Sequence, residues 1–268
     1  MHLRITGLAP HDEITVASEA TDHQDKAWQA QAVFRADAHG VVALDSTAPV
    51  SGSYQGKDGM GLFWSMNPVS GDPDQAAFIP VNPEVRPSFE VTISVTSHGR
   101  KLTTRTLTRQ WVAGGVGSKA LTPASAGVAG ELFLPPAGAS RHPAVLLFGG
   151  SEGGNSVKYT AALLASHGYP ALALGYFNLP GLPATLQNIP LEYFATAARV
   201  LAAQPGADPA HVIALGYSRG SEAALLLGED YPDLIHGVVV YSPSVQVNPG
   251  LPAGGRPGPR TADRSPRV

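Results

Sequence analysis

The chain has 268 residues, of which 43% are hydrophobic and 15% are charged, and its formal net charge is −3. This balance is typical of a globular protein with one or two domains, and it gives no reason to expect a nucleic-acid partner. The absence of cysteine excludes disulfides, thiolate metal ligands and a cysteine nucleophile. No signal peptide is visible, and no apolar run approaches the roughly 20 residues that span a bilayer, so we expect a cytoplasmic protein without a membrane span.

Residues 1–118 are predicted to form an all-β, immunoglobulin-like sandwich. Residues 89–97 (FEVTISVTS) alternate apolar and polar side chains as a half-buried strand does, and residues 100–111 follow a Ser-His-Gly turn as the second strand of a hairpin. Residues 13–19 and 28–34 show a weaker form of the same alternation. Turn dipeptides such as Asp-Gly and Asn-Pro recur between these segments, and no segment has convincing helical spacing, which favours an antiparallel sandwich.

Residues 119–126 are predicted as a linker, and residues 127–248 as an incomplete α/β-hydrolase domain. In this second domain buried apolar runs alternate with segments of helical spacing, which predicts a parallel sheet with helices on both faces. Residues 249–268 hold five Pro, four Gly and four Arg, and we expect this tail to be disordered. The predicted strands of the domain are residues 142–148, 171–174, 211–215 and 237–241, and its predicted helices are residues 156–167, 190–203 and 219–227.

The sequence GYSRG at residues 216–220 matches the pattern G-x-S-x-G. It falls between a predicted strand and a predicted helix, so Ser218 is expected on a tight strand-to-helix turn with its hydroxyl exposed as a nucleophile. Gly216 and Gly220 are expected at positions where a side chain would collide with the neighbouring strand and helix. The alternative is a tight turn that happens to contain serine.

A second glycine-rich segment, GGSEGG at residues 149–154, directly follows a predicted buried strand. In a hydrolase of this kind, the loop after an early strand and the residue after the nucleophile supply the N–H groups that stabilise an oxyanion. We therefore predict an oxyanion hole formed by Gly150, Ser151 and Arg219; the alternative is a loop without a role. The spacing fits no phosphate-binding pattern, and no two His lie at ligand spacing, so no cofactor and no metal are expected.

Several segments in the same order along residues 1–250 resemble the acyl-CoA thioesterase and bile acid-CoA:amino acid N-acyltransferase family. They are GMGLFWSM at 59–66, LLFGGSEGG at 146–154, ALGYFNLPGLP at 173–183, LEYF at 191–194 and GYSRG at 216–220.

The resemblance implies a nucleophile that takes the acyl group from an acyl-CoA substrate and passes it to water or to an amino acid. Family members that conjugate amino acids tend to use Cys as the nucleophile, so Ser218 favours thioester hydrolysis. The alternatives are an acyl-CoA:amino acid N-acyltransferase, a dienelactone-type carboxylesterase and a non-catalytic acyl-binding remnant. The sequence makes no prediction of the oligomeric state.

One departure from the hydrolase pattern concerns the partners of the serine, which follow it in the order acid, then His. His236 is the only His after Ser218 and comes directly before the next predicted strand, and Asp263 lies in the predicted tail. The acid and the His of the triad are therefore predicted to be absent, with the domain cut short near residue 250. We expect the activity to be impaired, because a serine hydroxyl without a base attacks poorly.

Overall fold

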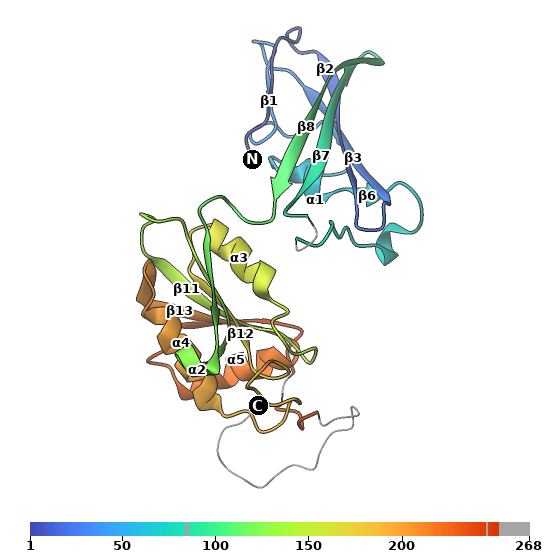
Figure 1. Cartoon of the computed structure of the whole chain (residues 1–268). Helices are drawn as coiled ribbons and strands as arrows, with labels where there is room; N and C mark the ends of the chain where they lie inside the picture. Colours follow the sequence, from blue (N-terminus) through green and yellow to red (C-terminus); the bar gives the residue numbers. More distant parts are fainter. Residues whose placement is uncertain (84–85, 245, 252–268) are drawn as a thin grey trace. The chain divides into compact units, whose positions relative to one another are not determined.

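The computed structural model describes residues 1–83, 86–244 and 246–251, and its chain forms two compact units (Figure 1). The N-terminal unit is Met1–Trp111 and the C-terminal unit begins at Val112, so the boundary lies a few residues before the predicted one at 118. From residue 252 onward, the predicted disordered tail lies outside the described residues.

The sheets of the N-terminal unit are antiparallel. One sheet has the order β5-β3-β2-β7-β8 with β6 paired to β3, and a two-stranded sheet is formed by β1 and β4. The hairpin predicted at residues 89–111 is β7 and β8, and the weaker strands are β2 and β3. The elements are β1 (Arg4–Ile5), β2 (Glu13–Thr21), β3 (Ala27–Arg35), β4 (Val42–Ala43), β5 (Ser51–Gly52), α1 (Gly61–Trp64), β6 (Asn67–Pro68), the 3₁₀ turn η1 (Pro73–Gln75), β7 (Ser88–Ser97) and β8 (Arg100–Gln110).

The core of this unit lies on one face of β2, β3 and β7. Their burial alternates with the period of two that the sequence shows, so Val16, Phe34 and Val91 are fully buried. Leu44 after β4 and Leu62 in α1 cover the same face and join this core. The one-turn helix α1 was not predicted, and the immunoglobulin-like character of the unit stays a prediction.

The C-terminal unit has a six-stranded sheet of order β14-β13-β11-β12-β10-β9. Strands β14, β13, β11 and β12 are mutually parallel, whereas β12, β10 and β9 are antiparallel neighbours. The sheet is thus mixed, and the predicted purely parallel sheet was wrong at this edge. The elements are β9 (Gly117–Leu121), α2 (Pro123–Ala126), β10 (Ala129–Leu134), β11 (His142–Phe148), α3 (Lys158–Ser166), β12 (Ala171–Gly175), α4 (Leu191–Ala202), β13 (Ala207–Tyr217), α5 (Arg219–Asp230) and β14 (Gly237–Tyr241).

Residues 119–126, which we predicted as a linker, form the end of β9 and the helix α2 instead. Thr122 caps α2 by accepting the backbone N–H of Ser125, and Pro123 occupies the first turn, where its missing N–H does no harm. The polar and Pro-containing composition that indicated a linker therefore belongs to a capped helical turn between two strands.

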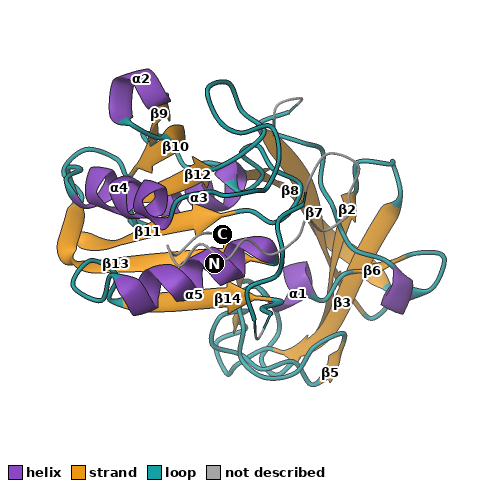
Figure 2. Cartoon of the chain, turned by 90° about the horizontal axis from the view of Figure 1, so that it is seen from below, coloured by secondary structure: helices purple, strands orange, loops and turns teal. Residues whose placement is uncertain are grey.

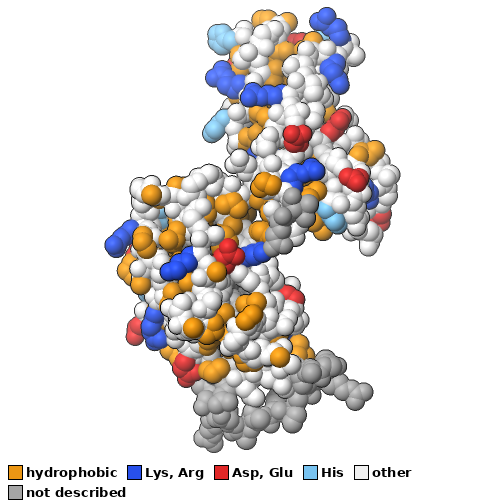
Figure 3. All heavy atoms as spheres, in the orientation of Figure 1, with side chains coloured by type: hydrophobic (Ala, Val, Ile, Leu, Met, Phe, Trp, Pro, Cys, Tyr) orange, Lys and Arg blue, Asp and Glu red, His pale blue; other side chains and the backbone are white. Residues whose placement is uncertain are grey.

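Helices cover both faces of this sheet, as predicted. In β11 the side chains of Leu146 and Phe148 pack toward α4 and α5, whereas Val145 and Leu147 pack toward α3. Figure 2 shows α4 and α5 side by side along the parallel strands. On the face drawn in Figure 3, the C-terminal unit presents many apolar side chains. Strand β14 is an edge of the sheet, and Val239 and Tyr241 on it are 42% and 51% exposed.

Candidate functional site

Ser218 lies at the carboxyl edge of the parallel strands, between the end of β13 and the start of α5. Its backbone has φ 49° and ψ −118°, a region that side-chain-bearing residues rarely adopt, and its side chain is exposed. Its N–H donates to the Tyr241 carbonyl at 2.9 Å, and its own carbonyl accepts the N–H of Ser221 at 2.9 Å. Neighbouring strand and helix thus hold a conformation that would otherwise relax.

Gly216 and Gly220 are placed where the backbone leaves no room for a side chain. A Cβ atom on Gly216 would lie 2.3 Å from the Gly220 carbonyl oxygen. A Cβ atom on Gly220 would lie 2.3 Å from the carbonyl oxygen of Gly149 and 2.9 Å from Cβ of Phe148. The glycines of the turn therefore allow the start of α5 to approach the glycine-rich loop after β11.

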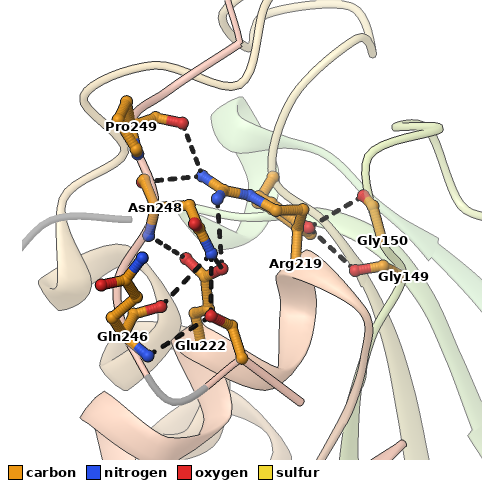
Figure 4. Close-up of polar contacts among 9 residues, drawn as sticks. Gly149, Gly150, Arg219, Glu222, Gln246, Asn248 and Pro249 are labelled. Carbon is orange, nitrogen blue, oxygen red and sulfur yellow. Dashed lines mark hydrogen bonds and ion pairs between the residues drawn. The ribbon is translucent and has the colours of Figure 1, made fainter. Parts of the chain in front are cut away.

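The glycine-rich loop lies beside Ser218. A Cβ atom on Gly150 would be 3.1 Å from Cβ of Ser218. The hydroxyl of Tyr176, which is 2% exposed, donates to the carbonyls of Gly149 at 2.8 Å and Gly150 at 3.0 Å. Figure 4 shows both carbonyls pointing to the same side. In a trans peptide the N–H points away from the carbonyl, so Tyr176 also orients the N–H groups of Gly150 and Ser151.

The three predicted oxyanion donors differ in their surroundings and in whether their N–H already has an acceptor. Arg219 is the first residue of α5, where N–H groups lack partners within the helix. Ser151 is exposed in the loop. The N–H of Gly150 donates to Oε1 of Glu152 at 2.8 Å, so this donor already has a carboxylate acceptor. Sequence reasoning missed Glu152 and Tyr176, although both follow apolar strands at the carboxyl edge of the sheet, which was the available signal.

The Arg219 side chain forms a buried ion pair that the sequence reasoning also missed. Its guanidinium donates to Oε1 of Glu222 at 3.1 Å, and the two side chains are 11% and 2% exposed. The guanidinium also donates to the carbonyls of Asn248 and Pro249, each at 3.0 Å, while the Asn248 backbone and side-chain amides donate to Glu222 at 3.0 and 2.7 Å (Figure 4). The i, i+3 spacing in the first turn of α5 was the signal for the pair.

The His residues of the C-terminal strands lie at the opposite end of the sheet from Ser218. His236 precedes β14, donates its N–H to the Val212 carbonyl and accepts the Val212 N–H at Nδ1. Its ring lies 6.3 Å from that of His211, near the amino ends of β13 and β14. Asp263 lies outside the described residues. Within the described ranges, no three His, Cys, Asp or Glu gather closely enough to hold a metal ion.

Comparison with known proteins supports the motif-based resemblance. Residues 1–122 match the family described as acyl-CoA thioester hydrolase/BAAT N-terminal region. Acyl-coenzyme A thioesterase 6 of Mus musculus is 30% identical over 250 residues, which cover 91% of this chain and 58% of that protein. Bile acid-CoA:amino acid N-acyltransferase of Mus musculus is 31% identical over 256 residues, again 91% of this chain and 58% of that protein. The chain thus spans less than two thirds of these relatives.

Solved structures match about half of the chain. A hypothetical protein from Pseudomonas aeruginosa has a TM-score of 0.40 and 21% identity, with 50% of this chain and 46% of that chain covered. A dienelactone hydrolase-like promiscuous phosphotriesterase from metagenomic libraries has a TM-score of 0.39 and 21% identity, with 48% and 59% covered. Among the described residues, no helix is long and apolar enough to cross a membrane. The family match and the curated relatives confirm the resemblance inferred from the motifs: this chain is similar, over most of its length, to the acyl-CoA thioesterase and bile acid-CoA:amino acid N-acyltransferase family.

Proposed function

We propose that the C-terminal unit carries the nucleophile half of an acyl-CoA thioester hydrolase. The observation that supports this most directly is Ser218, exposed on a turn of positive φ, with the glycine-rich loop next to it. In the proposed site, the Ser218 hydroxyl faces the N–H groups of the loop and of the start of α5, which is the arrangement that acyl transfer needs. The similarity to acyl-CoA thioesterases suggests the substrate class.

In the proposed reaction, the Ser218 oxygen attacks the thioester carbonyl carbon and gives its proton to a base. The carbonyl oxygen becomes an oxyanion next to the N–H groups of Arg219 and of the loop. Collapse of this intermediate re-forms the carbonyl, breaks the carbon–sulfur bond and releases CoA as a thiol once the thiolate takes up a proton. Water then attacks the acyl-serine ester, which yields the free acid and restores the hydroxyl.

Among the described residues of the C-terminal strands, no His is a candidate for the base of this reaction, since His236 lies at the opposite end of the sheet from Ser218. We therefore propose that the activity of this chain is impaired, with the remaining rate coming from oxyanion stabilisation and substrate binding. We further propose a cytoplasmic location.

A fluorophosphonate probe tests the nucleophile directly, since it labels an activated serine without needing a natural substrate. We expect slow labelling of the chain and none of the Ser218→Ala variant, while the Ser151→Ala variant, the matched control in the neighbouring loop, is still labelled. Equal labelling of the chain and of Ser218→Ala would exclude Ser218 as the nucleophile.

Rates of palmitoyl-CoA and p-nitrophenyl palmitate cleavage separate the thioesterase from a dienelactone-type carboxylesterase. A preference for the thioester supports the first. Glycine or taurine added to the palmitoyl-CoA reaction separates hydrolysis from amino-acid conjugation, because only an N-acyltransferase forms the amide. Acyl-CoA binding without cleavage or labelling would favour the acyl-binding remnant.

A further inference from the structure

Glu152 lies in the glycine-rich loop with its carboxylate directed at the predicted oxyanion donor. Its Oε1 atom accepts the Gly150 N–H at 2.8 Å and the Ser156 hydroxyl at 2.5 Å. A Cβ atom on Gly150 would be 2.8 Å from Oε2 of Glu152 and 3.1 Å from Cβ of Ser218. A single methyl-sized position beside Gly150 therefore touches both the carboxylate and the serine.

The charge of this carboxylate persists at neutral pH. Burial raises the pKa of Glu152, but hydrogen bonds from the Ser156 hydroxyl, from its own backbone N–H and from Gly150 outweigh burial and lower the pKa below its ordinary value. An ionised carboxylate accepts a backbone N–H more strongly than a neutral carbonyl oxygen does. A thioester carbonyl therefore competes poorly with Glu152 for the N–H of Gly150.

The same lowered pKa argues against Glu152 as the general base for Ser218. A base is most effective when its pKa lies near the working pH, and a carboxylate whose pKa is below the ordinary Glu range takes up a proton poorly at neutral pH. The Glu152 carboxylate accepts the Gly150 N–H and the Ser156 hydroxyl, and among the described residues it makes no hydrogen bond with the Ser218 hydroxyl.

We propose that Glu152 is a positioning residue that occupies the oxyanion donor of the resting site and has to leave Gly150 before Ser218 can react. This inference rests on the proposed function of Ser218. It adds a closed state of the loop, in which the internal carboxylate takes the place of the substrate oxyanion. Glu152 is an exposed residue at the protein surface, so its carboxylate can move into water without leaving a buried charge unpaired.

The test compares the rates of fluorophosphonate labelling for the Glu152→Ala and Glu152→Gln variants with that of the unchanged chain. A hydrogen bond to a charged group is stronger than one to a neutral group, so the Glu152→Ala variant, which frees the Gly150 N–H, is expected to react roughly tenfold faster or more. Glu152→Gln keeps an acceptor without the charge and is expected to show a smaller acceleration. Glu192→Gln, which removes an exposed charge from α4, is the matched control and is expected to leave the rate unchanged.

The pH dependence of the labelling rate distinguishes the proposed role of the Glu152 charge from a purely structural role of its side chain. The ratio of the Glu152→Gln rate to the unchanged rate is expected to fall toward one as the pH drops below about 4.3, because protonation then removes the charge in the unchanged chain. The Gly150 amide proton, followed by NMR, is expected to shift over the same pH range and to stop doing so in Glu152→Gln. A Glu152→Ala variant that reacts no faster than the unchanged chain, whether slowly or not at all, would overturn the inference.

The proposed function fails on a different result. Introducing Ser218→Ala into the Glu152→Ala background removes the nucleophile without affecting the loop carboxylate. If labelling of the double variant equals that of Glu152→Ala, Ser218 is not the nucleophile. If labelling is lost but Glu152→Ala alone gave no acceleration, Ser218 keeps its role and only the inference about Glu152 is wrong.

Discussion

Gly216 and Gly220 lie in contact across the turn that holds Ser218. A Cβ atom on Gly216 would lie only 2.3 Å from the Gly220 carbonyl oxygen, so there is no room for a side chain. The atoms on both sides of this contact belong to the backbone. A side chain at either position would therefore displace the strand end, the start of α5 or the glycine-rich loop, and no flexible side chain can absorb the shift.

Gly216→Ala and Gly220→Ala are each expected to destabilise the C-terminal unit by about 2–3 kcal/mol. The control is Gly117→Ala in β9, where a Cβ atom would meet nothing within 4 Å, and it is expected to change stability by less than about 0.5 kcal/mol. Urea unfolding followed by far-UV circular dichroism measures the unit with the long helices. Tryptophan fluorescence monitors the N-terminal unit, which contains all three tryptophans, as an internal reference. Equal stabilities of the three variants would contradict the close packing of this turn.

The positive φ of Ser218 has a cost that can be measured. A residue with a side chain at φ 49° and ψ −118° is strained by roughly 1–3 kcal/mol, and glycine tolerates positive φ. Ser218→Gly is therefore expected to be more stable than Ser218→Ala by about 1 kcal/mol, although neither variant can be labelled. Thermal unfolding of the two variants checks this order, and a more stable Ser218→Ala would show that the turn is unstrained.

The hydroxyl of Tyr176 is expected to contribute to the stability of the C-terminal unit and to the reactivity of Ser218. Tyr176→Phe leaves the carbonyls of Gly149 and Gly150 without their buried donor, which costs about 1–3 kcal/mol and loosens the loop beside Ser218. We expect reduced stability together with slower fluorophosphonate labelling. Tyr169→Phe is the control, since that ring is 36% exposed and its hydroxyl makes no hydrogen bond recorded among the described residues. A Tyr176→Phe variant that matches Tyr169→Phe in both measurements would rule out the positioning role.

Local pattern was enough to predict most of the parallel strands and helices of the C-terminal unit. The apolar runs of β11 and β13 and the helical spacing of α5 are properties of adjacent residues, and the serine turn follows from its place between β13 and α5. Strands β9 and β10 were missed because their short, Ala- and Gly-containing sequences have little strand character. The antiparallel direction of β10 depends on its pairing with β12, which is about forty residues further along the chain, and β9 in turn pairs with β10.

Two of the missed contacts of the candidate site join segments that are distant in the sequence. Tyr176 reaches Gly149 across 27 residues, and Asn248 reaches Glu222 across 26. Ser218 could be found because its motif is contiguous, whereas no local spacing distinguishes Tyr176 from any other aromatic residue at a strand end. Glu152 was within the recognised loop, but its contact with Gly150 depends on the folded shape of that loop.

The buried pair of Arg219 and Glu222 is expected to behave as one unit. Arg219→Met or Glu222→Leu alone leaves an uncompensated buried charge, and each is expected to cost about 3–5 kcal/mol. The double variant removes both charges and is expected to cost clearly less than the sum of the two single changes. Urea unfolding of the unchanged chain, the two single variants and the double variant gives the four free energies of a double-mutant cycle. Additive effects would show that the two charges act independently.

Stability of the N-terminal unit is expected to depend on pH through Asp22. Burial raises the pKa of this carboxyl, but hydrogen bonds from the Trp28 indole and from the backbone N–H groups of Lys26 and Gln24 outweigh burial and lower the pKa. A lowered folded-state pKa contributes stability that is fully present above the unfolded value of about 3.9 and is lost as the pH falls through the folded value.

Asp22→Asn is therefore expected to be less stable than the unchanged chain at neutral pH, with a difference that shrinks as the pH falls below about 3.9. Urea unfolding followed by tryptophan fluorescence suits this measurement, because Trp28 is the hydrogen-bond donor and is 4% exposed. Asp25→Asn is the control in the same turn, since Asp25 is exposed and asparagine tolerates its φ of 60°. A difference for Asp22→Asn that stays constant from neutral to acidic pH would mean that the Asp22 charge does not stabilise this unit, because the ionised and the protonated carboxyl would then bind the Trp28 indole equally well.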